Sequence, residues 1–82
     1  MKQYTAKLHG KCPFHRGWDY YSLVIKTNEF MKCEDIEATC DIVRGATITQ
    51  EAMAKQLRES FPSHCTFDLS GVHANVETIV SL

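Results

Sequence analysis

The stretch "TITQEAMAKQLRESF", residues 47–61, decides the fold, because it carries the clearest helical pattern in the chain. Thr47 precedes Gln50 by three positions, which is the spacing of a capping box at a helix N-terminus. Apolar side chains recur on one helical face at Met53, Leu57 and Phe61. Pro62 follows and ends the pattern. The stretch therefore predicts a helix with one apolar face.

A second helix is predicted immediately before this one. The segment "CEDIEATCDIV", residues 33–43, has acidic residues in its first turn and apolar residues at helical spacing, namely Ile36, Cys40 and Val43. Arg44 and Gly45 follow, as is typical of a helix C-terminus. Two consecutive helices thus occupy the middle of the chain.

Strands are predicted on both sides of the helices. Four segments have the alternation or the aromatic and β-branched composition of strands: 2–9, 19–27, 65–73 and 75–82. In the first segment, Tyr4, Ala6 and Leu8 share one face, and the second segment should run antiparallel to it. The last two should form a hairpin that turns near Ala74 and Asn75.

The order of elements predicts an α+β fold, ββααββ, in a single domain of residues 1–82. We expect a four-stranded antiparallel sheet with both helices on one face. The other face carries Tyr, Thr, Ser and Val side chains, and no segment is left to cover it. A chain this short buries only about 60–65% of its unfolded surface. The small size and the bare face together predict an oligomer.

Composition narrows the class of function. Hydrophobic residues make up 44% of the chain, which is ordinary for a globular domain. Nine basic and ten acidic residues give a net charge of −1, so charge gives no support for nucleic-acid or membrane binding. The N-terminal segment has no apolar core of signal-peptide length. We therefore expect a cytoplasmic protein whose four cysteines are reduced thiols.

The loop "KCPFHRGWD", residues 11–19, concentrates chemically capable side chains. A cysteine acts as a nucleophile only if its thiol can lose a proton, and positive charge from neighbours such as Lys11, His15 and Arg16 favours that loss. Cys12 is therefore a candidate nucleophile, and Asp19, which begins the next strand, a candidate proton donor. An ordinary loop cysteine remains the alternative.

Two further chemistries concern metal binding and purine recognition. Zinc is not expected, because there is no Cys-x2-Cys pair and the spacing of the soft ligands matches no common zinc pattern: His9, Cys12, His15, His64, Cys65 and His73. Histidines 9, 15 and 64 are expected to be surface residues in loops. Glu34 and Glu51 each begin a helix, where a carboxylate favours the helix dipole. A carboxylate can also accept two parallel N–H bonds from a purine-like ring edge.

Together these motifs resemble the QueF family of T-fold enzymes, whose loop has the form C-P-x5-D, as in "CPFHRGWD" here. The resemblance continues through "KCEDIE", "TQEAMAKQL" and "DLSGVHANVETIV", and spans about residues 10–82. It implies a T-fold that forms a barrel of several subunits with active sites at the interfaces. It also implies that Cys12 attacks the nitrile of 7-cyano-7-deazaguanine to give a thioimide, with Asp19 as the acid. Glu34, Glu51 and Gln50 would bind the 7-deazapurine, either free or carried in a nucleic acid.

Departures from the family pattern bear on the reaction. The NADPH-dependent reductases carry a lysine-rich motif after the first glutamate, whereas residues 34–39 here are acidic. The family's histidine before the second glutamate is Gln50. Both differences favour the QueF-like amidinotransferases, in which ammonia displaces the cysteine and no cofactor is needed. The alternatives are an NADPH-dependent nitrile reductase, a non-catalytic T-fold binding module, and a relative of the zinc-dependent cyclohydrolases, which carry Gln-Glu.

Overall fold

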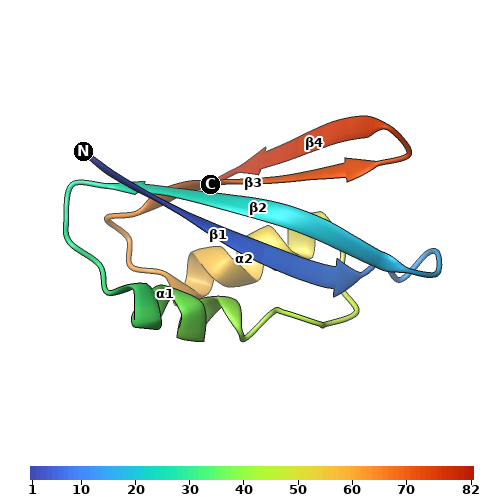
Figure 1. Cartoon of the computed structure of the whole chain (residues 1–82), viewed down its shortest axis with the longest axis horizontal. Coiled ribbons are helices and arrows are strands. Elements are labelled where there is room, and N and C mark those ends of the chain that lie inside the picture. Colours follow the sequence, from blue (N-terminus) through green and yellow to red (C-terminus); the bar gives the residue numbers. More distant parts are fainter.

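A computed structural model describes residues 1–82 and shows the predicted ββααββ order. The elements are β1 (Lys2–Lys11), β2 (Trp18–Thr27), α1 (Cys33–Cys40), α2 (Gln50–Ser60), β3 (Thr66–His73) and β4 (Val76–Ser81). All neighbouring strands pair antiparallel, in the order β1-β2-β3-β4. Both helices lie on one face of this sheet (Figure 1). The fold is therefore α+β, as predicted, and its topology is consistent with a T-fold.

The strands form where alternation places apolar side chains toward the helices. In β1 and β2 the paired residues Ala6 and Leu23 are both buried, as are Leu8 and Tyr21. The predicted β3–β4 turn is also confirmed, since Ala74 and Asn75 have φ angles of 50° and 67°. Two consecutive positive φ angles are the requirement of the tight hairpin turn that matches strand twist.

Helix α2 begins later than the capping box predicted. Thr49 is the N-cap, and its hydroxyl accepts a hydrogen bond from the backbone N–H of Ala52 at 3.2 Å. The prediction that Thr47 caps the helix is wrong, because Thr47 lies in a parallel bridge with Lys11 and its backbone is held extended. The predicted buried face is correct, and its residues reach the core: Met53, Leu57 and Phe61.

Helix α1 ends at Cys40 and not at residue 43. Beyond Cys40 the chain forms a tighter turn, in which a backbone N–H donates to the carbonyl three residues earlier, as from Val43 N–H to Cys40 O. The Arg44 guanidinium fastens this end, since it donates to the backbone oxygen of Lys7 and to the carboxylates of Glu37 and Asp41. The predicted apolar face is nevertheless confirmed: Ile36, Cys40 and Val43 are all buried.

The face of the sheet opposite the helices is uncovered, as predicted. Large side chains are exposed on it, including Tyr20 at 72%, Val72 at 60% and Ile79 at 53%. Edge strands β1 and β4 have no strand partner on their outer sides. Neither helix has the length and apolar character that crossing a membrane would require.

Candidate active site

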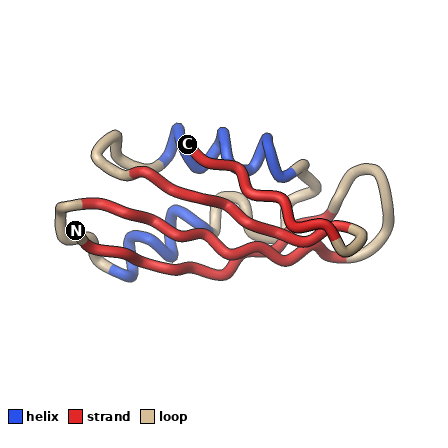
Figure 2. Tube along the Cα trace, turned by 90° about the horizontal axis from the view of Figure 1, so that it is seen from above, coloured by secondary structure: helices blue, strands red, loops and turns tan.

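Four of the five predicted site residues meet at one end of the sheet. The β1–β2 loop, the N-terminus of α2 and the β3–β4 hairpin all lie at this end (Figure 1), and Figure 2 shows the loop extending beyond the strands. They surround a pocket of about 200 Å³. Four predicted site residues line it: Cys12, Asp19, Gln50 and Glu51. The structure therefore brings together residues from three separate parts of the chain.

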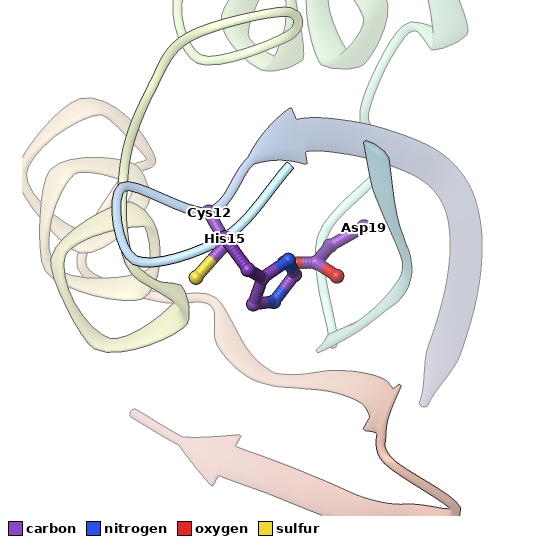
Figure 3. A group of neighbouring side chains, drawn as sticks. All are labelled: Cys12, His15 and Asp19. Atoms are coloured by element: carbon purple, nitrogen blue, oxygen red, sulfur yellow. The ribbon is translucent and has the colours of Figure 1, made fainter. Parts of the chain in front are cut away.

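The β1–β2 hairpin places the thiol beside the carboxyl group. Lys11 pairs with Trp18 and Gly10 with Asp19, so Cys12 and Asp19 stand at the two ends of one short loop. The Cys12 Sγ, a ring nitrogen of His15 and a carboxylate oxygen of Asp19 all lie within 4.8 Å of one another. In Figure 3 the His15 ring lies between the other two side chains. Thiol, imidazole and carboxyl group therefore form one cluster at the end of the β1–β2 loop.

The connection between the helices carries α2 to this loop. The Lys11 N–H donates to Ala46 O and the Ile48 N–H donates to Lys11 O, both at 2.9 Å. The Gly45 N–H likewise donates to His9 O at 2.9 Å. These bonds bind residues 45–48 to the end of β1. Because α2 starts directly afterwards, its first residues are fixed at the mouth of the pocket.

Gln50 is buried, with 4% of its surface exposed, and it braces the pocket wall. Its side-chain nitrogen donates to the backbone oxygens of Leu69 and Thr78, both at 2.8 Å. Its side-chain oxygen lies 3.1 Å from the Nε2 atom of His73. Both amide hydrogens are thus used within the fold, which leaves neither free for the predicted contact with a substrate.

Tyr21 lines the pocket together with Asp19. Its ring lies against Gly71 on the neighbouring strand, where an added Cβ would come within 2.5 Å of a ring carbon. Burial, followed by the charges of Asp19, Cys12 and Glu51, raises the pKa of Tyr21 to about 12. The phenol therefore stays neutral and keeps its proton at physiological pH.

The two predicted glutamates have different positions. Glu51 lies in the first turn of α2, exposed at the rim of the pocket. Glu34 is exposed in the first turn of α1, which lies at the opposite end of the sheet (Figure 1), and it does not line this pocket. Within one chain, Glu34 is therefore not brought together with Cys12.

His9, Lys11 and His64 lie outside this pocket. His9 lies in β1, not in a loop as predicted, and packs against the rings of Trp18 and Tyr20. The Lys11 ammonium lies over the Trp18 ring, 5.0 Å from its centroid. His64 is tied to Thr27, its Nδ1 atom 2.8 Å from the threonine hydroxyl. The soft ligands do not form one cluster.

The cysteines differ in accessibility. No disulfide links them: Cys12 is partly buried, Cys33 exposed, and Cys40 and Cys65 completely buried. Burial raises the pKa of Cys40 to about 11, and it also raises the pKa of Cys65. These two are packed as small apolar residues, and Cys12 is the cysteine that lines the pocket.

The sequence indicates His73 only as one of the soft ligands that match no zinc pattern, whereas the structure places it in the pocket. It lies at the end of β3, and its Nδ1 atom is 3.7 Å from Asp19 Oδ1. One signal could have found it: alternation along β3 places His73 on the same face as the buried residues Phe67 and Leu69. A polar side chain at an inward position beside a turn indicates a site.

A scan against protein-family models, a search of curated proteins and a search of solved structures each found no match to the chain.

Proposed function

We propose that the chain is a QueF-like enzyme that processes the nitrile of 7-cyano-7-deazaguanine through a thioimide on Cys12. One observation carries the proposal: Cys12 and Asp19 line the same pocket, and the thiol lies beside the carboxyl group. A nitrile carbon accepts a thiol readily only as its nitrogen receives a proton. The pocket supplies both a thiol, from Cys12, and a proton donor, from Asp19.

In the proposed step the Cys12 thiol adds across the nitrile triple bond. The Cys12 sulfur bonds to the nitrile carbon, and one proton passes, net, from the thiol to the nitrile nitrogen. Asp19, close to the sulfur, takes the thiol proton and gives it to nitrogen. The neutral Tyr21 phenol supplies a hydrogen-bond donor beside them.

Binding of the deazapurine edge falls to the glutamates in this proposal. Glu51 at the rim can accept two ring N–H bonds. Glu34 would have to come from a second copy of the chain, because its own α1 lies at the far end of the sheet. The open edges of β1 and β4 and the uncovered sheet face support the homo-oligomeric barrel that such sharing requires.

The charges around α1 favour displacement by ammonia over reduction by NADPH. The first turn carries Glu34 and Asp35 and no basic residue. Two basic residues flank the segment and could compensate from a neighbouring subunit: Lys32, which is exposed at the N-cap, and Arg44, which is already paired with Glu37 at 2.9 Å and Asp41 at 2.8 Å. A cofactor with a pyrophosphate and a 2′-phosphate needs positive charge that this segment does not supply.

Product analysis tests the proposal. Purified protein and 7-cyano-7-deazaguanine are incubated with ammonium or with NADPH, and products are identified by mass. We expect an amidine that requires ammonium and is lost in Cys12→Ala. An aminomethyl product that requires NADPH would overturn the choice of reaction. Tight deazapurine binding without product under either condition would show a non-catalytic binding module.

A second candidate is a zinc-dependent relative of the cyclohydrolases. The close approach of Cys12, His15 and Asp19 favours it, because thiolate, imidazole and carboxylate are the ligand types of zinc, and three protein ligands leave a fourth position open. Metal analysis of protein purified without chelator separates the two candidates. One zinc per chain, lost in Cys12→Ala, would replace the nucleophile assignment.

A further inference from the structure

The two oxygens of the Asp19 carboxyl group are held differently. Oδ1 faces the Nδ1 atom of His73 at 3.7 Å, which is an ion-pair distance and too long for a hydrogen bond. Oδ2 is buried and has no hydrogen-bond partner. The side chain as a whole is 11% exposed. Buried polar atoms without a partner are rare, and a catalytic role is one of the explanations for them, beside strain or a bound water or ion.

The orientation of the His73 ring is decided by Gln50. The side-chain nitrogen of Gln50 must face Leu69 O and Thr78 O, since two carbonyl oxygens can only accept hydrogen bonds. Its oxygen therefore faces His73 Nε2, at 3.1 Å, and can only accept as well. Nε2 must carry a hydrogen. The other ring nitrogen, Nδ1, is then the one that faces Asp19.

We propose that His73, held by Gln50, is the positioning residue for Asp19. One proton between Nδ1 and Oδ1, whichever atom carries it, attracts that oxygen to the ring. Oδ2 then remains without a partner and is left to relay the thiol proton to the nitrile nitrogen. This inference rests on the proposed function for its chemical consequence, whereas the arrangement of Gln50, His73 and Asp19 does not depend on it.

The hairpin makes this placement possible. His73 is the last residue of β3, and the turn at Ala74 and Asn75 follows at once. His73 also lies 5.9 Å from Tyr21, measured between ring centroids, so its ring is packed on one side and held by Gln50 on another. An imidazole that is packed against Tyr21 and held by Gln50 at Nε2 has little freedom to turn away from Asp19.

Two substitutions test the roles of the two ring nitrogens of His73 separately. In His73→Asn the amide nitrogen can occupy the place of Nδ1 and donate to Asp19, whereas in His73→Gln it reaches toward Gln50. We expect His73→Gln to slow adduct formation on Cys12 by about 10–100-fold in single turnover. His73→Asn should recover part of that loss. Binding of the nitrile, measured with each variant in the Cys12→Ala background, should stay unchanged.

His9→Gln is the matched control, because His9 contacts Trp18 and Tyr20 and does not line the pocket. It should form the adduct at the wild-type rate. Wild-type kinetics in His73→Gln, or an equal loss in His9→Gln, would overturn the proposal. A parallel loss of binding would also overturn it, since positioning of Asp19 should affect the chemical step alone.

A second measurement needs no substrate. Long-range ¹H–¹⁵N spectra of the full chain report which nitrogen of the neutral His73 ring carries the hydrogen. We expect Nε2 in the wild type and a loss of that preference in Gln50→Met. A ring with its hydrogen on Nδ1 and none on Nε2 in the wild type would refute the arrangement. If the spectra agree but the wild type forms no adduct, the proposed function fails and the placement of His73 stands.

Discussion

Replacing Gln50 by methionine should destabilise the protein far more than its modest change in size suggests. The two side chains have similar length, so the substitution removes polar contacts without opening a large cavity. Three are lost: the donations to Leu69 O and Thr78 O, and the contact with His73. At about 1 kcal/mol net for each, the free energy of unfolding should fall by about 3 kcal/mol.

That loss is large for a small domain, whose total is about 0.05–0.15 kcal/mol per residue. The midpoint of thermal unfolding should fall by about 12–24 °C. Urea unfolding followed by circular dichroism measures the change, and Gln56→Met, an exposed position on the same helix, is the control. If the unfolding free energies of Gln50→Met and Gln56→Met differ by less than about 0.5 kcal/mol, Gln50 does not brace the pocket wall.

Two further predictions concern ionisation and thiol access. The pKa of Tyr21 is raised in the folded protein to about 12, against the usual 10.0. Because the unfolded chain loses this proton at lower pH, the contribution of Tyr21 to the free energy of unfolding is complete below pH 10 and is lost as the pH rises toward 12. Tyr21→Phe should lessen the fall in unfolding free energy over that range, and an unchanged fall would contradict the assignment. Brief alkylation of the native protein should label Cys12 and Cys33 only, as counted by mass. Equally rapid labelling of the buried cysteines, Cys40 and Cys65, would contradict their burial in the core.

The architecture could be predicted because its signals are local. Alternation in β1 and the apolar face of α2 each depend on residues close in sequence, and burial follows those patterns. The boundaries were less predictable where distant backbone intervenes. Thr47 and Gln50 have the spacing of a capping box, but bonding of residues 45–48 to β1 moves the helix start to Gln50.

The site was predictable only in part, for the same reason. Cys12 and Asp19 flank one loop, so their proximity follows from a predicted hairpin. Gln50 and Glu51 reach the pocket only through the contact between Lys11 and the segment before α2, and no local pattern encodes that contact. His73 lies 54 positions from Asp19 in sequence and pairs with it only through the folded sheet.

Intact-mass measurement after incubation with 7-cyano-7-deazaguanine alone tests the central claim most directly. The wild type and Cys33→Ala, in which the other accessible thiol is removed, should each gain the mass of one nitrile molecule. Cys12→Ala should gain nothing, and Asp19→Asn should gain the same mass more slowly. An unmodified wild-type protein, or an adduct that persists in Cys12→Ala, would contradict the claim that Cys12 captures a nitrile.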